Sequence, residues 1–449
     1  MKGKDKILST LDKMVKQSKA DHTEAVYIGG ESGLTRYANS TIHQNVSELN
    51  SKVYFRTALG KKIGVASTNS LDENNLKKAL ASALEIAKNQ KDNPYFDSLP
   101  PKADYRKIDT YIEETAKFSP LERAERVQKI FEMARPYKLD VAGSFTTGEV
   151  EIGVANSRGV VCYQGLTSSA INIIAMSDTS SGYSDALSRD VDEIDVDDLA
   201  EAAIKKCLDS RNPKEVEPGE YTVILEPVAV GCLMEWLGYI AFGSKPFLEG
   251  TSFIAGNVGK KMMGENITIY DDGNDPSGIA FPFDFEGVPK RKVTFVEKGI
   301  AKEVVFNTID ANQGKTKSTG HSLTPDSSEG GFALNVFIQG GNSSLEKMIQ
   351  STEKGILITR FHYINGYLDT RVALMTGMTR DGTFWIENGK VKHGIKNLRF
   401  TESMTKAFSN VVALSKERKI VNVWWGDVGC TVTPAMLIKN FKFTGKTEF

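Results

Sequence analysis

The architecture is best understood from one segment, Tyr221-Thr222-Val223-Ile224-Leu225-Glu226-Pro227-Val228-Ala229-Val230-Gly231-Cys232-Leu233-Met234-Glu235-Trp236. The run from Tyr221 to Leu225 is apolar and β-branched, which is typical of a strand. Pro227 then opens an apolar run that continues to Phe242, and proline is favoured at the first position of a helix. The segment therefore predicts a buried strand that leads directly into an apolar helix.

Upstream of this segment, helices and strands do not alternate regularly as they do in a doubly wound sheet. Apolar periodicity predicts a strand at residues 26–30 and helices over residues 71–91, 120–137 and 197–210. Residues 140–176 alternate between apolar and polar side chains, with turns that indicate an antiparallel meander. The predicted fold class is α+β: antiparallel strands with flanking helices at the N-terminal side, then a C-terminal β-rich domain with one apolar helix.

A chain of 449 residues is too long for one ordinary core, so several domains are expected. Proline-rich segments mark the boundaries, first at Leu99-Pro100-Pro101 and then between Asn212 and Gly219. We expect an N-terminal α+β domain at 1–95, a linker at 96–118, a central α+β segment at 119–216 that packs with the N-terminal domain, and the C-terminal β-rich domain at 217–449.

Composition excludes several function classes. The formal net charge is -1, from 56 Lys and Arg against 57 Asp and Glu, so no global field favours nucleic acid. No run of about 18 apolar residues predicts a membrane span, and the first residues lead into an amphipathic pattern without an apolar signal core. The four cysteines lie far apart and form no CxxC pair. A cytoplasmic protein with idle thiols is expected.

Several motifs along the chain resemble those of the TldD/PmbA family, the "modulator of DNA gyrase" proteins. They are Arg36-Tyr37-Ala38-Asn39-Ser40, Phe247-Leu248-Glu249-Gly250-Thr251-Ser252-Phe253, Ser318-Thr319-Gly320-His321 and Thr379-Arg380-Asp381-Gly382-Thr383-Phe384-Trp385-Ile386-Glu387-Asn388-Gly389-Lys390. The segment at 221–236 resembles the junction at which TldD members carry a zinc-peptidase His-Glu-x-x-x-His. When the shared Ala229-Val230-Gly231 is aligned, Pro227 replaces the first His, Val228 the Glu and Cys232 the second His. The resemblance therefore implies the TldE/PmbA-type branch, which lacks the zinc motif.

The residues offer no substitute metal site. Proline has no lone pair for zinc, and valine cannot act as a base. Cys232 with Glu226 or Glu235 supplies two ligands at most, and the five histidines show no i, i+4 pairing: His22, His43, His321, His362 and His393. Cys430 lies roughly where TldD members carry a Cys-Gly-Lys-x-Gly-Gln segment, without that motif around it. We expect no metal in this chain.

Other candidate site residues have two interpretations each. Cys232 is a candidate nucleophile, although a cysteine inside an apolar helix is usually a small buried hydrophobe. The turn Ser318-Thr319-Gly320-His321 and the pair Arg380-Asp381 are candidate walls of a substrate cleft. Alternatively, the turn satisfies its own polar groups, and Arg380 forms an internal ion pair with Asp381 or Glu387.

The resemblance implies a function as well as a fold. A TldE-like chain pairs with a TldD-like, metal-bearing subunit, and the pair encloses a chamber that degrades unfolded peptides, with zinc in the partner. Strand addition would suit such substrates because it depends mainly on backbone groups. Two alternatives remain open: a stand-alone hydrolase that uses Cys232 or an unrecognised metal site, and a non-enzymatic homodimeric peptide-binding protein. No nucleic-acid or membrane partner is expected.

Overall fold

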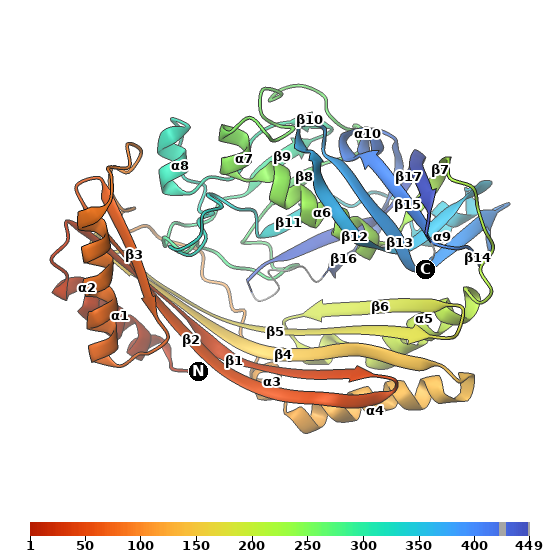
Figure 1. Ribbon diagram of the computed structural model, residues 1–449, viewed down its shortest axis with the longest axis horizontal. Helices are drawn as coiled ribbons and strands as arrows, with labels where there is room; N and C mark the ends of the chain where they lie inside the picture. Colours follow the sequence, from red (N-terminus) through yellow and green to blue (C-terminus); the bar gives the residue numbers. More distant parts are fainter. Residues whose placement is uncertain (422–427, 448–449) are drawn as a thin grey trace.

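The computed structural model describes residues 1–421 and 428–447. Its N-terminal part is built on a six-stranded antiparallel sheet with the order β3-β2-β1-β4-β5-β6 (Figure 1). Because β1 pairs with both β2 and β4, the segments before and after residues 96–118 share this one sheet. The strands are β1 (His22–Ala38), β2 (Thr41–Leu59), β3 (Lys62–Thr68), β4 (Asp140–Asn156), β5 (Val161–Met176) and β6 (Ser181–Ser188).

Two pairs of helices cover one face of this sheet, one pair toward each end of the long strands (Figure 1). At one end, α1 (Lys4–Gln17) and α2 (Glu73–Asn89) pack on Ala25 and Tyr27 of β1. At the other end, α4 (Pro120–Ala134) and α5 (Val196–Asp209) pack on Phe145 and Ile171. The short helix α3 (Glu113–Lys117) precedes α4. Ser119 and Glu122 form the capping box that begins α4, as its sequence pattern predicts.

The opposite face of the sheet packs against the C-terminal domain. Side chains on a strand alternate between faces, so Val26, Ile152 and Val154 lie on the side opposite Ala25 and Tyr27. They share a core with aromatic residues of the C-terminal domain, among them Phe281, Phe283 and Phe285. The N-terminal sheet is therefore the middle layer, with helices on one side and the C-terminal domain on the other.

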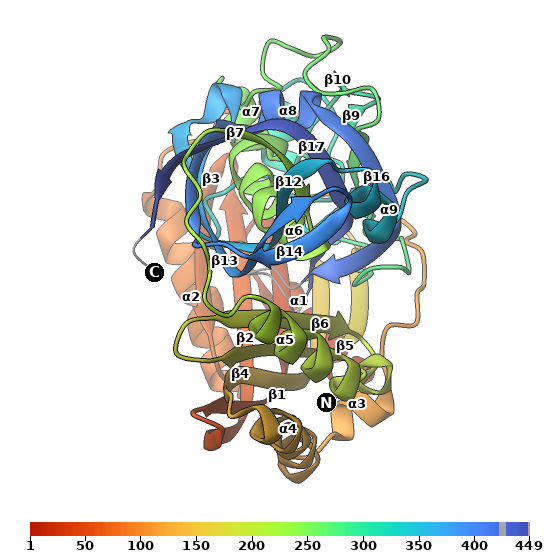
Figure 2. The ribbon, with the colours of Figure 1, turned by 90° about the vertical axis from the view of Figure 1, so that its right-hand side faces the viewer.

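The C-terminal domain contains an eleven-stranded mixed sheet. Five of its strands form a closed ring, because β17 pairs with β15 and β7, β7 pairs with β12, and β13 joins β12 to β15. Figure 2 faces this part of the domain, with α6 among the strands. The strands are β7 (Glu220–Leu225), β8 (Ile269–Asp271), β9 (Val293–Glu297), β10 (Ile300–Ala301), β11 (Asn335–Ile338), β12 (Lys354–Asp369), β13 (Leu374–Glu387), β14 (Lys390–Gly394), β15 (Leu398–Ser403), β16 (Val411–Val421) and β17 (Cys430–Lys446).

The apolar helix α6 (Pro227–Leu237) directly follows β7 and continues as one π-helical segment to Phe242. Its residues Ala229, Val230 and Leu233 belong to the same core as the inward side chains of the ring. The other helices of this domain are short: α7 (Ser244–Leu248), α8 (Thr308–Gln313), α9 (Leu345–Gln350) and α10 (Met404–Ser409). The prediction of an α+β fold with a β-rich C-terminal domain is confirmed. None of the described helices is long and apolar enough to cross a membrane.

A buried ionic group joins the two domains. The Arg56 guanidinium on β2 donates through Nη2 to Oε1 of Glu24 at 2.7 Å and through Nη1 to Oε1 of Glu286 at 2.9 Å. Glu286 also accepts from the backbone N–H and the hydroxyl of Thr308. One guanidinium therefore faces two carboxyl groups in a water-poor interior, and burial raises the pKa of Glu24 to about 7.

We expect stability to fall with rising pH through this group. The folded pKa of Glu24 lies above its ordinary value of 4.5, so its contribution is complete below pH 4.5 and is lost as the pH rises through about 7. The slope reaches at most about 1.4 kcal/mol per pH unit. The free energy of unfolding of Glu24→Gln, measured with urea between about pH 5 and about pH 8, should fall less with rising pH than that of the wild type. If the free energy of unfolding of the wild type and of Glu24→Gln changed equally with pH, the raised pKa of Glu24 would be refuted. The control is Glu387→Gln, at an exposed position, which should keep the pH dependence of the wild type.

Candidate functional site

A charged residue, Glu226, lies between the apolar strand β7 and the apolar helix α6, and its contacts hold this junction in place. Glu226 is the residue before α6, and its backbone N–H donates to Ile358 O at 3.0 Å. Its carboxylate accepts from Lys206 Nζ of α5 at 2.6 Å and from the Thr359 hydroxyl at 3.4 Å. Glu226 thus joins α5 of the N-terminal part to β12 of the C-terminal sheet.

The three positions that the sequence resemblance aligns with the zinc motif, Pro227, Val228 and Cys232, are packed into the scaffold. The Thr433 hydroxyl donates to Pro227 O at 2.7 Å, and Val228 is buried. Cys232 is partly buried, its Sγ lies 3.8 Å from Phe361 O, and its apolar surroundings raise its pKa to about 11. A thiol with so high a pKa is almost entirely protonated near neutrality, which is the opposite of what a nucleophile requires.

A second set of contacts joins β6 to the C-terminal domain beside α6. Alternate residues of β6 face that domain, as expected from the two-residue period of a strand. The Ser181 hydroxyl donates to Asp381 Oδ1 at 2.6 Å, and Asp185 forms an ion pair with Lys419 of β16. Leu187 lies in a core that contains Tyr270 and Phe337. The chain therefore closes this edge of the N-terminal sheet against β16 and the β12–β13 pair.

Between Ser181 and Asp185, Tyr183 meets an arginine. The Arg360 guanidinium lies 4.4 Å from the centre of the Tyr183 ring. It also donates through Nε to Asp381 Oδ2 at 2.7 Å, and its Nη2 bonds the same oxygen. Asp381 itself has a φ of 52° and is followed by Gly382 at 123°, so the backbone of β13 turns its carboxylate inward at this point. The buried carboxylate is matched by one guanidinium and one hydroxyl.

Arg380, the other member of the predicted pair, contributes less than Arg360 to binding the Asp381 carboxylate. Its side chain is 42% exposed and its Nε lies 3.9 Å from Asp381 Oδ1, so the closer partner of Asp381 is Arg360. The sequence interpretation gave Arg380 an ion pair with Asp381 or Glu387 as the alternative to a cleft wall, and it missed Arg360. Arg360 lies opposite Arg380, the residue before Asp381, in the register of β12 against β13. That register is interrupted by shifts and could not be read from the sequence.

The side chains of the turn Ser318-Thr319-Gly320-His321 form hydrogen bonds within the protein. Thr319 and His321 are each 1% exposed. His321 Nε2 lies 2.9 Å from Asp271 Oδ1, and its Nδ1 lies 2.9 Å from the Thr319 hydroxyl. Although burial opposes it, His321 holds the pKa of Asp271 below its usual value. The Ser318 hydroxyl donates to Phe306 O at 3.2 Å. The side chains of Thr319 and His321 thus bond within the protein, whereas Ser318 is partly exposed.

The candidate residues therefore fall into two separate networks. Asp381, Arg380 and Cys232 lie around α6, whereas residues 318–321 join β8 through Asp271. Cys430 lies beside the second network, because its strand neighbour Asn335 donates its N–H to Asp271. Its Sγ accepts from the Ile279 N–H at 3.1 Å, and burial raises its pKa to about 11. Within residues 1–421 and 428–447, no three His, Cys, Asp or Glu side chains gather as a metal site requires. The residues present at α6 do not fit a zinc ion.

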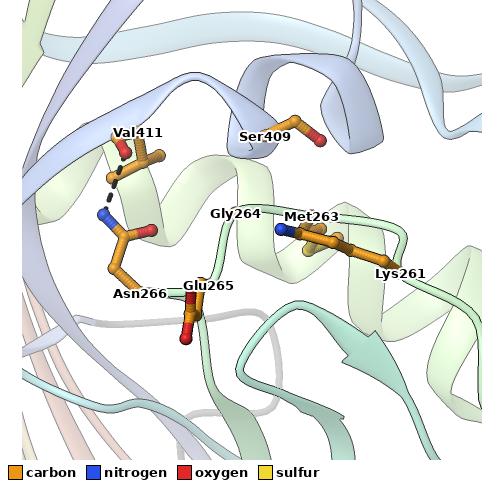
Figure 3. A pocket seen from close by; sticks show the side chains of 7 residues that line it. All are labelled: Lys261, Met263, Gly264, Glu265, Asn266, Ser409 and Val411. Carbon is orange, nitrogen blue, oxygen red and sulfur yellow. Dashed lines mark hydrogen bonds between the residues drawn. The ribbon is translucent and has the colours of Figure 1, made fainter.

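Several surface hollows lie away from these networks, among them two of different size. The larger, about 610 Å³, is lined by the 261–266 loop and the residues around Ser409 and Val411, where Asn266 Nδ2 donates to Val411 O at 2.9 Å (Figure 3). The second, about 360 Å³, lies against the middle of β1, β2 and β4. Lys52, on its rim, forms an ion pair with Asp326 of the C-terminal domain at 3.2 Å. The second hollow thus lies where the domains face each other.

Comparison with known proteins defines the class. Residues 218–445, which are 228 of the 449, match the model of the PmbA/TldA metallopeptidase C-terminal domain, and residues 23–87 match PmbA/TldA metallopeptidase domain 1. The C-terminal match alone covers half of the chain, and the chain belongs to the PmbA/TldA metallopeptidase family. The resemblance drawn from the sequence motifs is confirmed.

Relatives and solved structures agree with this assignment. The chain is 22% identical over 430 residues to a metalloprotease PmbA homolog of Buchnera aphidicola, with 92% of each chain covered. It is 24% identical over 425 residues to a metalloprotease PmbA homolog of Haemophilus influenzae, with 89% of each covered. Its fold is similar to that of TldE from Thermococcus kodakarensis, with a TM-score of 0.88 and 24% identity over 98% of this chain and 99% of that one. A putative modulator of DNA gyrase from Thermotoga maritima gives a TM-score of 0.86 at 18% identity, over 98% and 100%.

We expect the Arg360–Asp381 pair to matter for stability far more than the exposed Arg380. Replacing Arg360 with Ala leaves the buried Asp381 carboxylate without its cation, which should cost about 3 kcal/mol. Arg380→Ala removes a largely solvated charge and should change the free energy of unfolding by less than about 0.5 kcal/mol. Urea unfolding at neutral pH measures both. Equal effects of the two variants would show that the Arg360 pair does not hold the domains as described.

Proposed function

We propose that this chain is the non-metal-binding subunit of a cytoplasmic TldD/TldE-type peptidase complex that processes unfolded peptides. The observation that carries the proposal is the chemistry of α6. The helix α6 follows β7 at the position where the sequence resemblance implies the family's zinc helix, and Pro227, Val228 and Cys232 provide no pair of imidazoles and no carboxylate base. The helix serves as packed scaffold, and the zinc with its general base belongs to a TldD-like partner subunit.

The charged contacts beside α6 support this assignment. Glu226, the acidic group nearest the start of the helix, is bound by Lys206, and Asp381 is bound by Arg360 and Ser181. Each carboxylate therefore has a structural partner that compensates its charge. Such an arrangement holds β6 against β12 and β13, which is what a chamber wall needs.

An unpaired strand edge offers a place for an extended peptide. β3 pairs with β2 only from Val53 to Leu59, so residues 41–52 of β2 have no second strand partner among the described residues. The hollow of about 360 Å³ adjoins the end of this edge at Asn50, Ser51 and Lys52. Strand addition there would bind substrate through backbone hydrogen bonds and tolerate many side chains.

Activity and metal content of the lone chain and of a mixture test the proposal. The partner is a homologue that carries His-Glu-x-x-x-His, and the substrate is an unfolded peptide with a fluorescent label. We expect no cleavage and no stoichiometric zinc for the lone chain, and cleavage in the mixture. The control is a partner whose motif Glu is replaced by Gln, which should be inactive in the same mixture. Stoichiometric zinc together with peptidase activity in the lone chain would overturn the proposal.

Cys232→Ser separates the proposal from a thiol hydrolase. Because the pKa of Cys232 is raised to about 11, we expect the native thiol to react slowly with iodoacetamide near neutrality. The Ser variant should retain the activity of the mixture within about twofold, since a Ser→Cys pair differs little in volume at a packed position. Loss of activity in this variant with an unchanged melting temperature would favour a catalytic thiol.

A further inference from the structure

The hollow of about 360 Å³ lies on the domain-facing side of the N-terminal sheet, where the cover of the C-terminal domain ends. Along β1, Val26 is buried in the core that the two domains share, Ile28 is half-buried and Ser32 is exposed. These three residues share one face of the sheet because side chains on a strand alternate between faces. The sheet therefore continues past the domain contact, and the hollow lies on this uncovered part.

Glycines keep the floor of the hollow free of side chains. Gly30 of β1 lies opposite Val150 of β4. A Cβ at Gly30 would lie 1.8 Å from Glu149 O, and a Cβ at Gly148 would lie 2.9 Å from Glu31 O. The two strands thus approach each other more closely than side chains at these positions would permit. The floor consists of peptide backbone, over which a flat group can lie.

The walls of the hollow are apolar, and one cation lies at its rim. Ile28 and Val150 pack against the shared core, and the ring of the buried Tyr54 adjoins them. The Lys52 ammonium lies 4.5 Å from the centre of the Tyr54 ring and forms an ion pair with Asp326 at 3.2 Å. Because an ammonium group is attracted to the face of an aromatic ring, Lys52 can also contact a second ring in the hollow.

Size and charge indicate which chemical group fits. A cavity of about 150 Å³ is large enough to hold benzene, so the hollow has room for the ring of a Phe, Tyr or Trp side chain. Lys52 is already paired with Asp326, and the hollow therefore offers little to attract a strongly anionic ligand. A backbone floor, apolar walls and a cation at the rim together favour an uncharged aromatic ring.

The unpaired edge of β2 can bring such a ring to the hollow. A strand added at residues 41–52 would continue the line of β3, which pairs with β2 from Val53 onward. Asn69, which follows β3, lines the hollow, and its C=O accepts from the Ser51 hydroxyl at 3.1 Å. Side chains of an added strand alternate between the two faces of the sheet. A long side chain on its domain-facing side would extend over β2 toward Gly30.

We propose that this hollow binds an aromatic side chain of an extended peptide that adds to the free edge of β2. The inference rests on the proposed function in taking a peptide as the ligand, and it gives binding through the backbone a side-chain preference. Large aromatic side chains are mostly buried in folded proteins. A site that requires one on an extended strand therefore selects unfolded segments over folded proteins.

Fluorescence anisotropy of the lone chain with labelled peptides tests the proposal. The probes are fluorescein-labelled ten-residue peptides of Gly, Ser and Thr that carry Phe, Leu or Ala at one central position. We expect the Phe peptide to bind about tenfold more tightly than the Ala peptide, because an apolar ring leaves water, and more tightly than the Leu peptide. Equal binding of the Phe and Leu peptides, or no binding of any peptide, would overturn the proposal.

Two variants and a modified peptide locate the binding to the hollow. Ser32→Trp fills the hollow from an exposed position and should make the affinities for the Phe and Ala peptides equal. Lys52→Met removes the ammonium and should lower the ratio of Phe to Leu affinity about threefold. The matched control is Ser82→Trp on the exposed side of α2, which should keep the preference of the wild type. Circular dichroism checks that each variant is folded.

A Phe peptide with methylated backbone nitrogens lacks the donors for strand addition and should not bind. Retained binding of this peptide, or a preference for Phe that survives both Ser32→Trp and Lys52→Met, would overturn the proposal. Cleavage of the Ala peptide by the mixture with a TldD-like partner does not depend on the hollow. The proposed function and the side-chain preference therefore fail separately.

Discussion

The alternation of side chains along the N-terminal sheet is the constraint on which the other features depend. The strands are long enough that four helices pack on one face of the sheet, while the C-terminal domain packs on the other face. Since the period of a strand is two, a shift of one residue in any strand would exchange these two cores. Glu24 and Arg56 lie on the domain-facing side, as do Ser181, Tyr183 and Asp185 of β6. The charged contacts that orient the domains thus follow from register.

These charged contacts also determine how β6 and α5 lie beside α6. A buried ion pair contributes little net stability compared with apolar residues of the same shape, whereas loss of one partner is costly. Asp381 with Arg360, and Glu226 with Lys206, therefore act mainly by allowing one arrangement of β6 and α5 relative to α6. The apolar core alone would tolerate small sliding movements at this boundary. The polar contacts fix the geometry of this boundary.

Much of the fold could be predicted from the sequence because its local signals are strong. Pro227 marks the first residue of α6, Ser119 caps α4, and the meander at 140–176 forms the adjacent strands β4 and β5. The strand at 26–30 was predicted too short, since β1 runs from His22 to Ala38 through Gly29, Gly30 and Gly33. Those glycines weaken a strand pattern, although the close contact of Gly30 with Glu149 O shows that the sheet needs them.

The candidate site was less accessible to prediction because it depends on contacts distant in sequence. Nothing near Asp381 in the chain points to Ser181, 200 residues away, and nothing near Glu226 points to Lys206 on a different domain. The motif at residues 221–236 located α6 correctly. The motif at residues 318–321 could not show whether the side chain of His321 is buried or exposed. Which polar residues meet is decided by the closure of β6 against the ring of strands. In this fold, therefore, the surroundings of α6 are set by domain packing, which brings together side chains that lie far apart in the sequence.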